Sequence, residues 1–158
     1  MKKEFIPYNE ALALKELGFD EPCIAHYTSH GYYNSIKELK WKRPTFSLCG
    51  GVTITNGSLT WQEDSNVILK QVIAPTFSQA FRWFREKYGL YSWVTMELGA
   101  TLTFCWTITG ENKGTEYKAF LKTHEEAELE CLKKLIKIVK DGQQMNIKCD
   151  NVIYPNSN

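Results

Sequence analysis

Three side chains in the first third of the chain could bind a metal ion, because Cys23, His26 and His30 lie close together. Thiolate and imidazole groups are the usual ligands of zinc. A structural zinc site needs four ligands, and no second Cys or His pair follows at ligand spacing. We therefore expect no metal site and interpret these residues as part of a strand and the loop after it.

A short basic run with one indole inside it has the most suggestive binding chemistry. Its members are Lys37, Lys40, Trp41, Lys42 and Arg43. An indole face can stack on a base while neighbouring cations bind phosphates, and this combination suits a small nucleotide. Trp61 and Arg85 are further candidates for lining such a pocket. The alternative is a solvated turn whose Trp41 packs into the core.

A second candidate surface lies on a predicted helix, where Arg82 and Arg85 flank Trp83. These three residues project away from the apolar stripe of that helix. Tryptophan and arginine are enriched at protein interfaces, so Arg82 and Trp83 are predicted interface residues. The alternative is that Trp83 forms the edge of a broad core.

The sequence contains no recognisable catalytic motif. It has no G-x-S-x-G, Walker loop, dinucleotide fingerprint or H-E-x-x-H pattern. A nucleophilic pair of a cysteine with His26 or His124 is not favoured either, because Cys105 and Cys131 fall at positions that look packed. We expect a protein that is not an enzyme and uses no cofactor.

Composition predicts one globular domain. The 158 residues are 43% hydrophobic and carry a net charge of +1, so we assign a domain to residues 1–142 and a loose tail to 143–158. Without a strong overall field, long nucleic acid is not an expected partner, and any anion site must be local. Five scattered cysteines indicate a reducing cytoplasm, and no apolar run approaches the ~18 residues of a membrane span.

Three helices carry start and stop signals. The first covers 10–17 and ends at Gly18, with Phe19 folding back onto Leu14. The second opens with the capping box of residues 76–79, and its apolar stripe ends at Gly89. The stripe consists of Phe77, Ala80, Phe81, Phe84 and Tyr88.

The third helix runs from the capping box of residues 123–126 to Asp141-Gly142, and lysines at 133, 134, 137 and 140 complement its dipole. Its apolar positions, Leu129 and Ile136 among them, cover about half the circumference, more than a ~100° surface stripe. Such a helix is covered on two sides. Either it is sandwiched within one chain, or Leu129 and Ile136 pair with a second copy in a homodimer.

The remaining segments predict antiparallel strands. Asn56-Gly57 is a preferred pair for a tight turn and predicts a hairpin over 52–61. Strands are also expected at 23–29 and 67–73, whereas the conformation of 36–43 stays open. From 90 to 121 the period changes to two, which predicts a three-stranded meander.

These elements define an α+β fold of antiparallel sheet with helices packed on one face. The second half has helix–meander–helix order, as in a double-stranded-RNA-binding domain. Those domains use lysines at the start of the last helix to bind phosphates. Here that start is Thr123-His124-Glu125-Glu126, which would repel phosphates. RNA binding is therefore the third choice of function.

Three blocks of the sequence resemble small uncharacterised proteins of phages and prophages of Bacteroides-like bacteria. The blocks are Glu4–Cys23, Ala74–Leu90 and Thr123–Lys140. The resemblance covers a third to a half of the chain, in its helices, and leaves Ile24–Ile73 largely unmatched. It implies a phage accessory protein acting inside an infected cell, and it supplies no catalytic or binding residues.

The leading hypothesis combines the resemblance to phage proteins with the positive charge of the basic run. We expect a phage protein that counters host defence by sequestering a nucleotide immune signal, in a pocket lined by Lys40, Trp41, Lys42, Arg43, Trp61 and Arg85. The alternative is a protein-interaction module that inhibits a host defence enzyme through Trp83 and its neighbours. Both place the protein in the cytoplasm of the infected bacterium.

Overall fold

The computed structural model describes residues 2–33, 39–41, 43–49, 60–62, 67–110 and 115–150. Contacts divide the chain into two compact units, Met1–Ala80 and Phe81–Asn158. Both are built of antiparallel sheet and helix, which confirms the α+β class. The single domain predicted over 1–142 stays a prediction.

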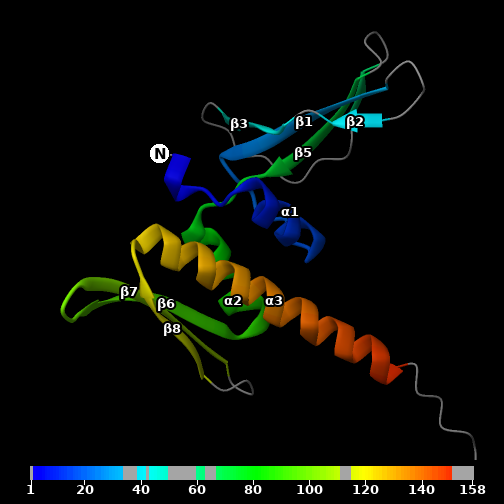
Figure 1. Ribbon diagram of the computed structural model, residues 1–158. Helices are drawn as coiled ribbons and strands as arrows, with labels where there is room; N and C mark the ends of the chain where they lie inside the picture. Colours follow the sequence, from blue (N-terminus) through cyan, green and yellow to red (C-terminus); the bar gives the residue numbers. More distant parts are fainter. Residues whose placement is uncertain are drawn as a thin grey trace, which may run out of the picture. The chain divides into compact units, whose positions relative to one another are not determined.

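The first unit combines one helix with a five-stranded sheet (Figure 1). Its elements are the 3-10 turn Lys2–Glu4, α1 (Tyr8–Glu16), β1 (Ala25–Tyr33), β2 (Leu39–Trp41), β3 (Thr45–Leu48), β4 (Thr60–Gln62) and β5 (Val67–Ile73). The strand order is β2-β1-β5-β4, and β3 also pairs with β1. The predicted strands at 23–29 and 67–73 are confirmed, although β1 starts at Ala25 and runs on to Tyr33.

Helix α1 ends as the sequence predicts. Gly18 adopts a φ of 85°, which only glycine reaches cheaply. The next amide, that of Phe19, donates to the Leu14 carbonyl over 2.9 Å, and both side chains are buried. The helix starts earlier than the expected residue 10, because its first helical residue is Tyr8, directly after Pro7.

The predicted hairpin over 52–61 lies mostly outside the described residues. Its last two residues, Thr60 and Trp61, belong to β4 and pair with Leu69 and Ile68 of β5.

Helix α2 (Phe77–Tyr88) begins in the first unit and continues into the second. The predicted capping box is present at its start. The backbone N–H of Gln79 donates to Thr76 Oγ1 over 3.2 Å, and the backbone N–H of Thr76 donates to Gln79 Oε1 over 3.0 Å. Of the predicted stripe, Phe77, Ala80 and Phe84 are buried, while Phe81 and Tyr88 are half-buried.

The second unit contains the predicted meander of β6 (Leu90–Leu98), β7 (Leu102–Gly110) and β8 (Thr115–Leu121), in the order β6-β7-β8. The pairing of β7 with β8 shifts between Phe104 and Trp106. At this irregularity Phe120 takes a φ of 65° and is 83% exposed. A positive φ is rare for a residue with a bulky side chain.

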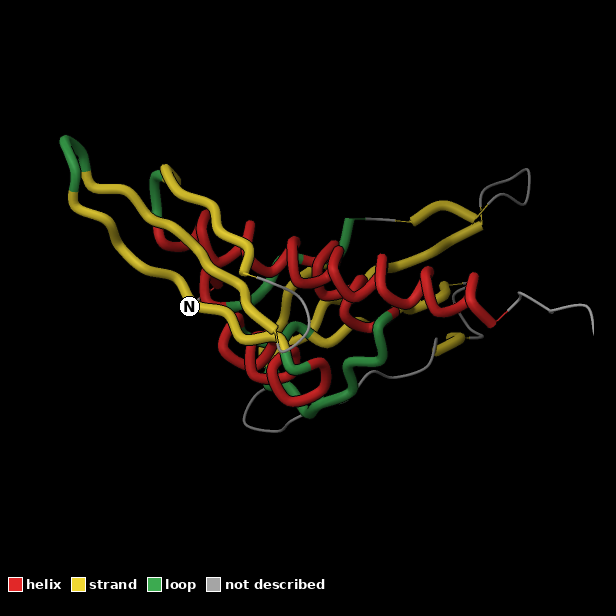
Figure 2. The backbone as a smooth tube through the Cα atoms, turned by 90° about the horizontal axis from the view of Figure 1, so that it is seen from below, coloured by secondary structure: helices red, strands yellow, loops and turns green. Residues whose placement is uncertain are grey.

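Helix α3 (His124–Asp150) lies along one face of the meander (Figure 2). Its broad apolar surface is buried, which confirms the wide stripe predicted for it. The buried members are Ala127, Cys131, Leu132, Leu135, Ile136 and Val139. The predicted stop at Asp141-Gly142 is wrong. Gly142 has no positive φ and continues the helix, which therefore extends to Asp150.

Candidate functional site

An open hollow of about 400 Å³ lies between β8 and α3 in the second unit. Its lining residues are Trp106, Tyr117, Lys118, Glu130, Lys133, Lys134 and Lys137. Four of these seven carry an ammonium group. We call this hollow the lysine pocket.

The lysines reach the pocket from two elements. On β8, Glu116 pairs with Ile108 and Lys118 with Trp106 of β7, so their side chains share the face that looks toward α3. On α3, positions 130, 133, 134 and 137 are three or four residues apart and so share one side of the helix. Strand alternation and helix period thus bring both groups together.

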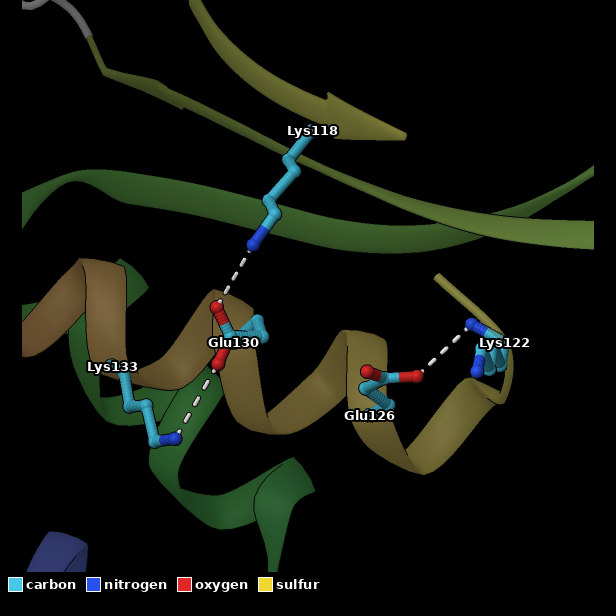
Figure 3. A network of polar contacts seen from close by, with 5 residues as sticks. All are labelled: Lys118, Lys122, Glu126, Glu130 and Lys133. Atoms are coloured by element: carbon cyan, nitrogen blue, oxygen red, sulfur yellow. Dashed lines mark hydrogen bonds and ion pairs between the residues drawn. The ribbon is translucent and has the colours of Figure 1, made fainter. Parts of the chain in front are cut away.

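Two carboxylates join the strand to the helix. Glu130 Oε2 accepts from Lys118 Nζ at 3.1 Å, and its Oε1 lies 3.4 Å from Lys133 Nζ (Figure 3). Glu116 Oε2 lies 2.6 Å from Lys134 Nζ. The hydrogen bond from Lys118 holds the pKa of Glu130 below its usual value, so this carboxylate is charged at neutral pH.

The pocket retains an excess of positive charge. Two carboxylates, Glu116 and Glu130, face four ammonium groups, and within the described chain no carboxylate pairs with Lys137. Because Lys137 is exposed, a solute can reach its ammonium group directly. The arrangement suits an anion that approaches from solvent.

Trp106 lines the pocket and carries a buried donor. The residue is 5% exposed, and its Nε1 has no hydrogen-bond acceptor in the described part of the chain. A buried N–H group without an acceptor costs about 1–3 kcal/mol.

The predicted nucleotide-binding residues occupy several places. Trp41 of β2 pairs with Gly31 of β1, Gly31 with Ile68 of β5, and Ile68 with Trp61 of β4. Trp41 and Trp61 therefore lie in one row of the sheet, three strand spacings or ~14 Å apart.

Those of their predicted partners that the structure describes belong to different parts of the chain. Lys40 is the neighbour of Trp41 in β2, and Arg43 is exposed beyond that strand. Lys42 lies outside the described residues, and Arg85 is exposed on α2 in the second unit. The predicted pocket stays a prediction.

Burial separates the predicted interface residues. Arg82 is exposed and Leu129 is half-buried, whereas Trp83 is 5% and Ile136 8% exposed. The Trp83 ring lies edge-on to Phe84, 5.1 Å away between centroids. Burial therefore favours the alternative that Trp83 is the edge of a broad core, and it places Ile136 in the core of a single chain.

One cysteine–histidine contact does form, although the sequence did not favour a pair of any cysteine with His26. Strands β1 and β3 bring Cys49 Sγ within 3.3 Å of His26 Nδ1. Burial raises the pKa of the Cys49 thiol, which opposes formation of the nucleophilic thiolate. Among the residues that the structure describes, no three or more His, Cys, Asp and Glu gather into a potential metal site.

Comparison with known proteins adds no information about this site. Neither protein family models, nor curated proteins, nor solved structures yield a match to this chain. None of the helices in the described part is long and apolar enough to cross a membrane.

Proposed function

We propose that this chain is a non-enzymatic binding protein for a small phosphorylated ligand, which it holds in the lysine pocket. The observation that carries the proposal is the excess of ammonium groups over carboxylates around one hollow, with Lys137 open to solvent. Lysine is a common phosphate-binding residue, acting as a point charge.

A nucleotide is the ligand class that we favour. The pocket combines four cations with the indole of Trp106 in its wall. Together with the resemblance to phage proteins, this supports the expected role of sequestering a nucleotide immune signal inside an infected bacterium. The proposed site is the lysine pocket, in place of the predicted run from Lys40 to Arg43.

Thermal unfolding with a panel of ligands tests the proposal. The panel contains inorganic phosphate, AMP, cyclic mononucleotides and cyclic dinucleotides. A ligand that binds only the folded protein at 100 times its Kd stabilises it by about 2.7 kcal/mol. We expect at least one nucleotide to raise the unfolding temperature by several degrees.

Matched lysine variants locate the binding. Lys137→Met removes the unpaired cation of the pocket, whereas Lys122→Met removes an exposed lysine outside it. We expect the stabilisation by the nucleotide to shrink in Lys137→Met and to persist in Lys122→Met. No stabilisation by any panel member, or an equal effect in both variants, contradicts the proposal.

A further inference from the structure

The opposite face of the meander carries exposed aromatic side chains. Glu116 and Lys118 form ion pairs with α3, and the Phe104 ring lies 6.0 Å from that of His124 on the same helix. Because side chains alternate along a strand, Trp93 and Tyr117 point away from α3. Their exposed fractions are 45% and 53%.

The strand register arranges these side chains into one surface. Trp93 of β6 pairs with Thr107 of β7, and Thr107 pairs with Tyr117 of β8. Tyr91 and Glu97 occupy the same face, respectively two residues before and four residues after Trp93. We call the surface of Tyr91, Trp93, Glu97 and Tyr117 the aromatic face.

The charge on the aromatic face is negative. The Tyr117 hydroxyl donates to Glu97 Oε1 over 2.5 Å, which fixes the carboxylate beside the ring. This hydrogen bond raises the pKa of Tyr117, so the hydroxyl stays protonated. The other described positions of this face carry no lysine or arginine. They are Thr95, Thr103, Cys105, Thr107, Thr109 and Thr115.

We infer that the aromatic face docks an arginine-bearing segment of a partner protein. A guanidinium group is planar, stacks on tryptophan and tyrosine rings, and pairs with a carboxylate. Its five N–H groups can donate to the Glu97 carboxylate and to the oxygens of the threonine hydroxyls. Trp93 supplies the stacking ring, and Glu97 supplies the counter-charge.

Two other occupants fit the charge less well. The phosphates of a single-stranded nucleic acid would meet Glu97 without a described cation on this face to offset it. A second copy, docked through the same face, would bring two Glu97 carboxylates together without a described cation between them. Trp93 and Glu97, which supply the stacking ring and the counter-charge, do not line the lysine pocket, whereas Tyr117 borders both sites.

NMR titration of the full chain tests the inference with the peptide acetyl-Gly-Arg-Gly-Arg-Gly-amide. Peptides with lysine or with uncharged citrulline in place of arginine are the matched probes. We expect the arginine peptide to shift the Trp93 indole signal and the amides of Glu97 and Tyr117. The lysine peptide should bind several-fold more weakly, and the citrulline peptide should cause no shift.

Two variants measure the contribution of the Glu97 carboxylate to binding of the arginine peptide. Glu97→Gln should weaken binding of the arginine peptide about threefold, in line with an exposed ion pair. Glu86→Gln changes an exposed carboxylate on α2 and should have no effect. Equal shifts with arginine and citrulline, shifts elsewhere in the chain, or an unchanged affinity in Glu97→Gln would overturn the inference.

Two further measurements test the other candidate ligands of the aromatic face. Decathymidylate that shifts Trp93 more strongly than the arginine peptide would replace the inference with nucleic-acid binding. A dimer in light scattering that Glu97→Gln strengthens would replace it with self-association. We expect no shift from decathymidylate and no such dimer.

Discussion

Glu130 holds Lys118 and Lys133 at once, at 3.1 and 3.4 Å, and so places a carboxylate where a ligand phosphate would lie. Any anion that enters the pocket competes with this carboxylate for the same two ammonium groups. Glu130→Gln removes the competing charge and keeps the shape of the side chain. We expect this variant to bind the nucleotide about threefold more tightly than the wild type in calorimetric titration. Weaker binding would show that Glu130 helps to hold the ligand.

The same carboxylate predicts a pH dependence of stability. Because Lys118 lowers the pKa of Glu130 in the folded chain, the ion pair stabilises the fold above the unfolded pKa of ~4.3. The contribution is lost as the pH falls through the lowered folded value. About a third of the Glu130 side chain is exposed, so we expect less than ~1 kcal/mol. Unfolding of wild type and Glu130→Gln from pH 7 to 3 should show a difference that vanishes at the acidic end.

The cysteines are expected to differ in reactivity. Burial raises the pKa of Cys23 and of Cys131 to about 12, which keeps both as thiols at pH 8. Cys49 is only partly buried and lies beside His26. In a Cys149→Ser background, iodoacetamide followed by mass spectrometry should find Cys49 alkylated first. Faster labelling of Cys23 or Cys131 would contradict the packing around them.

Two glycines offer a matched test of backbone strain. Gly18 has a φ of 85°, so Gly18→Ala should lower the free energy of unfolding by about 1 kcal/mol. Gly142 lies inside α3 without a positive φ, and Gly142→Ala should raise helix stability by about 0.5–1 kcal/mol. Chemical denaturation measures both. A loss of stability in Gly142→Ala would show that α3 ends near residue 142, as the sequence first suggested.

At Phe120, in contrast, we expect that introducing a glycine stabilises the chain, because the backbone there is strained. Its φ of 65° costs about 1–2 kcal/mol for a non-glycine residue, and the ring is 83% exposed. Phe120→Gly should therefore stabilise the chain by up to about 1 kcal/mol in denaturation. Leu98 is equally exposed but has no positive φ, so Leu98→Gly should destabilise. Loss of stability in both variants would mean that the Phe120 ring stabilises the fold.

Local signals in the sequence predicted most of the elements. The capping box at Thr76, the stop at Gly18 and the period-two pattern from 90 to 121 each depend on neighbours within a few residues. The structure shows the capped helix start, the helix end and the three strands. The helix stop at Gly142 failed because glycine tolerates helical geometry as well as ending it. Only tertiary contacts could decide between the two.

The candidate site could not be predicted in the same way. The lysines of α3 were visible in the sequence, but a helix with lysines in its second half is explained by its dipole alone. Their role depends on Glu116 and Lys118, which the register of β8 with β7 turns toward α3. That register includes an irregularity near Phe104, which no local sequence pattern predicts.

The most direct test of the lysine pocket is an NMR titration of ¹⁵N-labelled full chain with the nucleotide that gives the largest thermal shift. We expect the amides of Lys118, Glu130, Lys133 and Lys137 to move with the Trp106 indole signal, with one shared affinity that Lys137→Met reduces. Shifts confined to the run from Lys40 to Arg43, with no change at α3, would contradict the account.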